Sequence, residues 1–190
     1  MRIDSPAKIK IMNGFITLMG THPLSTIKVI DIIKESGVSH QTFYRTFLDK
    51  YDLAKKVCLS KLEIVYAVVG RNPTWHDAAL CTLNMIANDG TFFANLLSEK
   101  EGVAIMKGAI ESVTDEHIGI RSTDMAAEAW MYNLVRWSHN GFAETPDEIC
   151  DRILRSLPAG EIAKESEIAP FIEAYRKMRI GDFKNRGKNG

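Results

Sequence analysis

Residues 27–53, IKVIDIIKESGVSHQTFYRTFLDKYDL, constrain the fold of this chain more than any other segment. The first part carries isoleucine and valine at the spacing of a helix that packs on one side, Ile32 among them. Gly37 follows where the end of a helix needs a residue that tolerates positive φ. Val38 is a small apolar residue after this turn, and Ser39 is a favourable N-cap for a second helix. The pattern predicts two helices joined by a tight turn.

The second helix of this pair is short and has one apolar face. Phe43 and Phe47 are four residues apart and share a face, which we expect to point inward. The other side chains are hydrogen-bonding groups that we expect to face outward: His40, Gln41, Thr42, Tyr44 and Arg45. This is the layout of a helix-turn-helix, in which the second helix enters the major groove of DNA.

The segment GVSHQTFYRTFLDKYDL resembles the signature of TetR/AcrR-type transcriptional regulators. The places of that signature are filled, in order and at the family's spacing, by Gly37, Val38, Ser39, Thr42, Phe43, Tyr44, Phe47, Lys50 and Leu53. Ile32 also falls where the family has an isoleucine in its second helix. Together with VRWSHNGFAETPDEI, the segment is similar to the subgroup around the dihydroxyacetone-kinase operon regulator, whose type member is an activator that works with a protein partner.

The resemblance implies which residues touch DNA. Ser39, Tyr44 and Lys50 match the phosphate-contacting places of the family, whereas the variable, base-facing or groove-edge places are held by His40, Gln41, Thr42 and Arg45. Gln41 has the chemistry to pair with adenine in two hydrogen bonds, and Arg45 can reach guanine or phosphate. Two alternatives stay open: Tyr44 packs partly inward, or Arg45 pairs with Asp49 four residues later.

Lys28 departs from the family pattern. Relatives usually place serine or threonine there, to cap the second helix and to touch phosphate. A lysine side chain cannot accept a backbone N–H, so we expect the cap to move to Ser25 or Thr26. Lys28 is retained as a candidate DNA contact.

The formal net charge of zero hides an asymmetry along the chain. Residues 1–56 carry +4, residues 57–169 carry −8 and residues 170–190 carry +4. A basic head on an acidic body suits a protein that binds phosphates at one end. The charge split alone is also compatible with chance, but it coincides with the helix-turn-helix.

Helical periodicity continues along most of the chain and predicts an all-α fold. We expect a helix-turn-helix DNA-binding domain over residues 1–48 and a helical regulatory and dimerisation domain over residues 49–158, entered through a long helix over residues 50–69. Residues 159–190 are expected to form a further short helix and a flexible basic tail.

Two late segments, residues 125–142 and 146–157, carry more apolar residues than one inward stripe needs. Regulators of the resembled family dimerise through their last two major helices, so the resemblance implies a homodimer. The residues that we expect in its interface are Ala127, Trp130, Met131, Leu134, Ile149 and Ile153.

The resemblance also implies an apolar cavity for an unknown small-molecule inducer between the body helices. Methionine and aromatic residues at helical spacing more often form core, but they also suit an adaptable cavity wall. Candidates for its lining are Trp75, Met85, Phe92, Phe93, Met106, Trp130 and Tyr132.

The sequence shows no pattern of a catalytic, metal or cofactor site, and we expect no enzyme. Cys58, Cys81 and Cys150 are odd in number and far apart, which favours free thiols in a reducing cytoplasm. No apolar run reaches the roughly 20 residues of a membrane span. The prediction is a DNA-binding regulator, a repressor that binds a palindromic operator as a dimer and is released by a ligand. The alternative is a co-regulator of the same fold whose main contact is another regulatory protein.

Overall fold

A computed structural model of the protein describes residues 5–70, 74–118 and 124–156, and every regular element within these ranges is a helix. This confirms the all-α fold. The helices are α1 (Pro6–Met19), α2 (Val29–Ser36), α3 (His40–Thr46), α4 (Lys50–Val69), α5 (Trp75–Asn88), α6 (Gly90–Leu97), α7 (Lys100–Ile118), α8 (Asp124–His139) and α9 (Pro146–Ser156). The short helix and tail expected after residue 158 lie outside the described residues.

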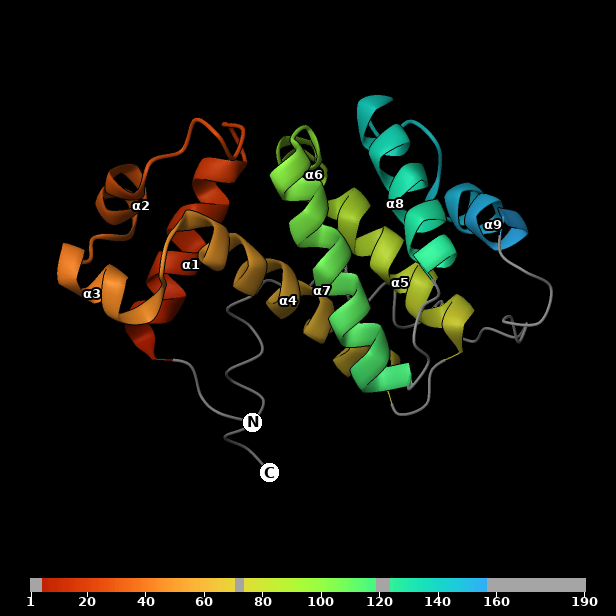
Figure 1. The fold of residues 1–190 in the computed structure, drawn as a ribbon, viewed down its shortest axis with the longest axis horizontal. Coiled ribbons are helices and arrows are strands. Elements are labelled where there is room, and N and C mark those ends of the chain that lie inside the picture. The colour runs from red at the N-terminus through yellow and green to blue at the C-terminus, as the bar shows by residue number, and fades with distance from the viewer. Residues whose placement is uncertain (1–4, 71–73, 119–123, 157–190) are drawn as a thin grey trace.

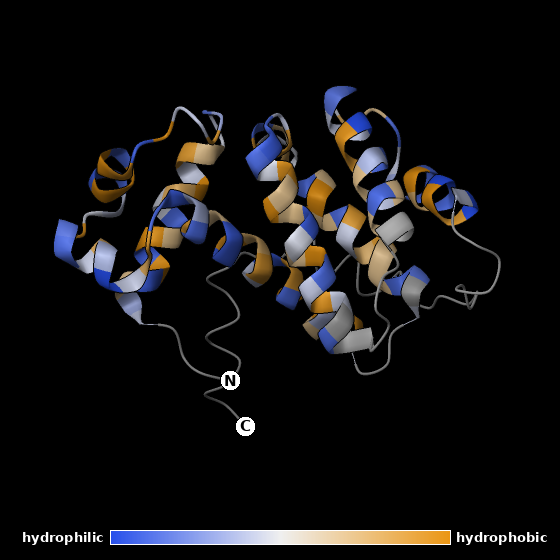
Figure 2. Ribbon diagram, viewed as in Figure 1, coloured by the Kyte–Doolittle hydropathy of each residue, from blue (hydrophilic) through white to orange (hydrophobic). Residues whose placement is uncertain are grey.

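Helices α1, α2 and α3 form a cluster at one end of the molecule, and α4 leads from it into a second cluster formed by α5 to α9 (Figure 1). In the body, α4 packs against α7 and α5, while α9 packs against α5 and α8. Hydrophobic and hydrophilic residues lie on different sides of most helices (Figure 2), as expected where each helix turns one face to a shared core. The first cluster is called the head and the second the body.

Side-chain caps fix where several helices begin. Ser5 accepts the N–H of Lys8 at the start of α1. Asp49 accepts two N–H groups at the start of α4, and Thr74 accepts the N–H of Asp77 at the start of α5. These caps satisfy N–H groups that have no partner within the helix, and the cap at Asp49 agrees with the expected start of the long helix over residues 50–69.

The expected shift of the α2 cap to Ser25 or Thr26 is wrong. Helix α2 begins after Lys28, whose side chain makes no capping bond. The carboxylate of Asp31 instead accepts the backbone N–H of Lys28 at 3.1 Å. One half of a capping box therefore holds the start of α2, because the other half needs an acceptor that lysine lacks.

The turn of the helix-turn-helix forms as expected. Gly37 ends α2 in the left-handed region at φ 63°, where a Cβ is unfavourable. Ser39 caps α3 by accepting the N–H of Thr42 at 3.1 Å. Phe43 and Phe47 are buried and pack with their ring centroids 5.9 Å apart. The inward face of α3 is thereby fixed against the head core.

The residues expected in the dimer interface are instead core residues of a single chain. All six are buried within it: Ala127, Trp130, Met131, Leu134, Ile149 and Ile153. The excess of apolar residues on α8 is explained by three neighbours in the same chain, because α6, α7 and α9 all pack against this helix. Burial within one chain thus accounts for these six residues without a second subunit.

The corner between α6 and α7 is unusually close. A Cβ added to Gly102 would lie 1.8 Å from the carbonyl oxygen of Leu96, whereas one added to Gly108, further along α7, would meet nothing within 4 Å. Only glycine lets the first turn of α7 approach the end of α6 this closely.

We therefore expect opposite effects from two alanine substitutions in α7. Gly102→Ala must displace backbone and should lower the free energy of unfolding by about 3 kcal/mol or more. Gly108→Ala should raise it by about 0.5–1 kcal/mol, because alanine favours the helix at an open position. Urea unfolding followed by circular dichroism measures both; equal effects from the two changes would contradict the close approach.

Candidate nucleic-acid interface

The outer face of α3 presents hydrogen-bonding groups to solvent. His40, Gln41 and Arg45 are exposed, and Tyr44 is 49% exposed. The Tyr44 ring lies beside that of His40, with centroids 4.8 Å apart, and its other neighbour is the edge of buried Phe43 at 5.2 Å. Tyr44 therefore rests on the helix surface with its ring half in solvent, rather than in the core.

Thr42 is less accessible than the other residues expected to face the bases. Its side chain is half-buried, and its hydroxyl lies 2.8 Å from that of Ser39. Ser39 itself is exposed at the N-terminus of α3, where backbone N–H groups favour a phosphate. Of these two residues, Ser39 has the better position to contact DNA.

Arg45 is exposed at the other end of α3. The carboxylate of Asp49, its expected alternative partner, accepts the N–H groups of Tyr51 and Asp52, both at 2.8 Å. Across the described residues, no ion pair joins Arg45 to Asp49. Arg45 can extend toward bases or phosphate.

Lys50, expected to contact phosphate, is bound within the protein instead. Its Nζ donates to the carbonyl oxygens of Leu24 at 2.8 Å, Ser25 at 2.9 Å and Ile27 at 2.9 Å. An ammonium group has three N–H donors, so all of them are used. Lys50 holds the loop between α1 and α2 onto the start of α4, and a direct phosphate contact would require breaking one of these bonds.

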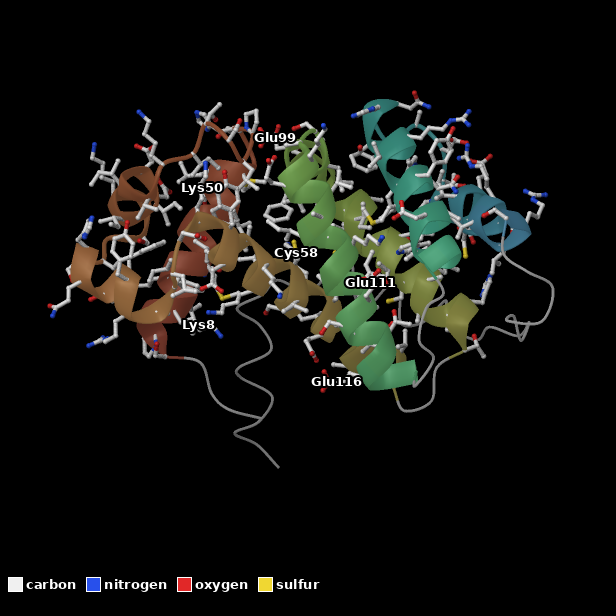
Figure 3. All side chains as sticks on the ribbon, in the orientation of Figure 1. Lys8, Lys50, Cys58, Glu99, Glu111 and Glu116 are labelled. Atoms are coloured by element: carbon white, nitrogen blue, oxygen red, sulfur yellow. The ribbon has the colours of Figure 1, made fainter. Side chains whose placement is uncertain are left out.

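Two further bonds join the end of α1 and the loop after it to the body. The amide of Asn95 in α6 donates to the carbonyl of Met19 at 2.8 Å, and Glu99, between α6 and α7, accepts the N–H of Ser25 at 3.1 Å. Figure 3 shows Lys50 and Glu99 on the two sides of this junction. The loop of residues 20–28 and the end of α1 therefore add hydrogen bonds to the packing of α1 against α6 and α4 that joins head and body.

Lys28 is exposed at the end of this loop, directly before α2. Its backbone N–H is used by Asp31, which leaves the side chain to solvent. The position suits a cation that meets a phosphate beside the recognition helix. Unlike the ammonium group of Lys50, that of Lys28 is thus in solvent.

The corner between α3 and α4 contains apolar residues that sequence reasoning missed. Leu48 is 80% exposed, and Tyr51 follows it at the surface of the first turn of α4. The backbone of Leu48 is fixed, because its N–H donates to Asp52 at 3.0 Å. Burial alone would raise the pKa of Asp52, but hydrogen bonds from Lys56 and from Leu48 lower it below its ordinary value. The sequence contains an indication of this exposure. Leu48 lies between Phe47, which is buried, and Asp49, which caps α4, so its side chain points away from the core.

The body contains a small cavity of about 50 Å³ between α4, α5, α7 and α8. Its lining is mainly apolar, with hydroxyl groups from Tyr66, Thr82 and Thr114. Burial raises the pKa of Tyr66, and a hydrogen bond with Thr114 partly offsets this. At the edge, the Nζ of Lys107 lies 4.0 Å from Glu111 and 2.5 Å from Glu128.

Of the residues expected to line a ligand cavity whose side chains the structure describes, only Trp130 lines this one. Met85, Phe92, Phe93 and Met106 are buried core residues. Phe92, for example, packs edge-on against Phe15 of α1, with centroids 6.4 Å apart. Tyr132 is on the surface, and the side chain of Trp75 lies outside the described part of the structure.

The three thiols are poorly suited to act as nucleophiles or metal ligands. Cys58, Cys81 and Cys150 are buried, and burial raises the pKa of each to about 12. Such thiols are protonated at neutral pH and are weak nucleophiles. Among the described residues, no group of three or more histidine, cysteine, aspartate or glutamate residues is placed to hold a metal ion. None of the described helices is long and apolar enough to cross a membrane.

Solved structures with a similar arrangement of helices are known. The crystal structure of a TetR transcriptional regulator from Streptococcus agalactiae 2603V matches with a TM-score of 0.60 and 20% identity, over 80% of this chain and 94% of that one. This likeness establishes the shared fold. Two matches are weaker. The dihydroxyacetone kinase operon activator DhaS matches with a TM-score of 0.44 and 14% identity, over 79% of this chain and 93% of that one. The TetR family repressor AlkX from Dietzia sp. strain DQ12-45-1b matches with a TM-score of 0.42 and 14% identity, over 91% of this chain and 98% of that one.

No protein-family model matches the sequence. No curated protein matches it either.

The bonding of Lys50 makes a prediction about stability. Lys50→Met removes three charge-assisted hydrogen bonds to partly buried carbonyls and should lower the free energy of unfolding by about 2–4 kcal/mol. Lys55→Met, an exposed change on the same helix, should alter it by less than about 0.5 kcal/mol. Urea titration compares them; if the two variants unfold alike, Lys50 does not hold the loop.

Proposed function

We propose that this protein is a DNA-binding transcriptional regulator and that residues 1–48 are its DNA-reading domain. The observation that carries the proposal is the division of α3 into two faces. Phe43 and Phe47 are buried, while Gln41, Tyr44 and Arg45 are in solvent. A short helix fixed in this way, after a tight glycine turn, has the geometry to enter the major groove.

Each exposed group has a proposed role. Gln41 pairs with adenine, and Arg45 reads guanine or holds a phosphate at the groove edge. Ser39, Tyr44 and Lys28 bind phosphates around the recognition helix and fix its register. Lys50 acts indirectly, because its bonds to the loop of residues 20–28 set the position of α2 relative to α4.

We further propose that the protein acts as a homodimer on a palindromic operator, with residues 49–158 as the dimerisation and regulatory domain. One short recognition helix contacts few base pairs, and a dimer sets two of them about 34–36 Å apart, one turn of duplex. The charge of +4 in residues 1–56, against −8 in residues 57–169, favours approach to DNA with the head first.

For regulation we propose a repressor that loses its operator when a small ligand enters the body. The cavity between α4, α5, α7 and α8 supports this, because its apolar wall and three hydroxyl groups suit a small, largely apolar molecule. Its volume of about 50 Å³ is well below the roughly 300–1,000 Å³ of typical ligand sites, so binding must enlarge it.

The small volume also supports a second candidate function. A body that is nearly filled by its own side chains favours control by a protein partner over control by an inducer. In that case the protein is a co-regulator of the same fold whose main contact is another regulatory protein. The two functions differ in one measurable respect: direct DNA reading involves phosphate contacts, whose contribution to affinity falls steeply with salt.

Selection from a library of random duplexes with the purified protein tests the proposal. We expect enrichment of a palindrome whose half-sites are about 10 base pairs apart, and affinity that falls by orders of magnitude between 50 and 200 mM salt. Failure to enrich any sequence, together with salt-independent binding, would favour the partner-dependent alternative.

Gln41→Ala tests the role of α3 on the selected operator. It should lose about 1–3 kcal/mol of discrimination at one base pair of each half-site while binding to random duplex stays unchanged. Asn88→Ala, which removes an exposed amide in the body, is the control and should bind like the wild type. Fluorescence anisotropy with single-base operator variants measures both; unchanged discrimination by Gln41→Ala would remove this residue from the interface.

A further inference from the structure

The large apolar side chains that stay exposed are concentrated at one end of the molecule. Among the side chains that the structure describes, only Tyr132, on α8, is such a residue in the body. The others are Ile30, Tyr44, Leu48 and Tyr51. Three of these lie within residues 44–51, which lead from α3 into the first turn of α4. A single exposed apolar residue needs no explanation, but a group of them indicates a contact surface.

Leu48 is the most exposed of the group, at 80%, in a position where an apolar residue is often covered. It directly precedes Asp49, the N-cap of α4. An apolar residue in this place commonly packs against the fourth residue of the helix, which here is Leu53. Leu53 is fully buried without it. The exposed leucine therefore contributes little to the start of α4, and its side chain is available to a partner.

The backbone that carries the apolar pair of Leu48 and Tyr51 is held in place. The N–H of Leu48 donates to the carboxylate of Asp52 at 3.0 Å, and the same carboxylate binds the Nζ of Lys56 at 2.9 Å. The N–H of Tyr51 donates to Asp49 at 2.8 Å. A contact made by side chains on a fixed backbone costs little ordering on binding.

The surroundings of the apolar pair are basic. Residues 45–56 contain four lysine or arginine residues and two aspartates, a net charge of +2. Both carboxylates already accept hydrogen bonds from the protein, whereas Arg45 and Lys55, before and after the pair in the chain, are exposed. An apolar surface flanked by cations suits a partner in which apolar groups alternate with negative charges. A DNA strand has this chemistry, because its phosphates are joined by deoxyribose rings with apolar C–H groups.

We propose that Leu48 and the ring of Tyr51 pack against deoxyribose in the strand beside the major groove that α3 enters. The inference rests on the proposed function and adds a contact that carries no charge. The pair is continuous with the exposed groups of α3, since Leu48 follows Tyr44 and Arg45 in the same corner. It lies past the C-terminal end of α3, whereas bases are contacted mainly from the N-terminal part of a recognition helix.

A sugar contact has two measurable properties. It involves no base edge, so it adds the same affinity for every duplex sequence. It releases no counterion, so it leaves the slope of log affinity against log salt concentration unchanged. Phosphate contacts share the first property but not the second, and base contacts share the second but not the first.

Leu48→Ala tests both properties. We expect its affinity for the selected operator and for random duplex to fall by about the same factor, roughly 10-fold or more, because apolar burial is lost. The salt slope should equal that of the wild type. Fluorescence anisotropy over 50–200 mM salt measures both. The side chain is 80% exposed, so the fold should be kept, which circular dichroism checks.

Three further variants serve as comparisons. Leu48→Lys replaces the apolar contact with a cation and should steepen the salt slope by about one for each new phosphate contact. Tyr51→Phe keeps the ring and should bind like the wild type. Tyr132→Ala, which removes the exposed ring of the body, is the control and should also bind like the wild type.

The outcomes separate this inference from the proposed function. Wild-type affinity in Leu48→Ala would overturn the inference and leave the apolar pair as a surface for a protein. A loss confined to one base pair would indicate a thymine methyl instead, and a loss with a shallower salt slope would indicate an ionic contact. Each of these results leaves DNA binding by the wild type intact. The proposed function itself fails when the wild type binds no duplex.

Discussion

The ammonium group of Lys50 is the contact on which the placement of the head depends. It donates to the carbonyls of residues 24, 25 and 27, at 2.8–2.9 Å, from the first residue of α4. Because α4 continues into the body, the contact ties the loop before α2 to a helix that extends through both parts of the molecule (Figure 1). The recognition helix is held from both ends: Gly37 and Ser39 set its start, and Asp49 begins α4 directly after it.

Local chemistry made much of this architecture predictable. Caps such as Asp49 and Thr74 accept N–H groups only two or three residues away. A helix start of this kind can therefore be predicted from a few consecutive residues. The same holds for Gly37, whose positive φ belongs to the turn itself. The outward face of α3 followed once Phe43 and Phe47 were assigned to the inside.

The predictions that failed depended on contacts between distant segments. The acceptors of Lys50 are backbone carbonyls more than 20 residues away, and a carbonyl has no side-chain signature in the sequence. Trp130 and Leu134 form an apolar pattern that is compatible with burial in one chain or between two. Only the packing of α6, α7 and α9 around α8 distinguishes these cases. Of the cavity lining, Trp130 was expected, whereas small and hydroxyl-bearing residues such as Ala78 and Thr82 were not, because nothing in their local sequence indicates that they meet at one cavity.

The approach of α7 to α6 at Gly102 has a mechanical consequence. Since there is no room for even one methyl group between Gly102 and the Leu96 carbonyl, the two helices have little freedom to pivot at their corner. Asn95 and Glu99 lie at this corner and bond to Met19 and Ser25 of the head. We therefore expect the α6–α7 corner to be rigid, so that α6, α7 and the bonds to the head move together.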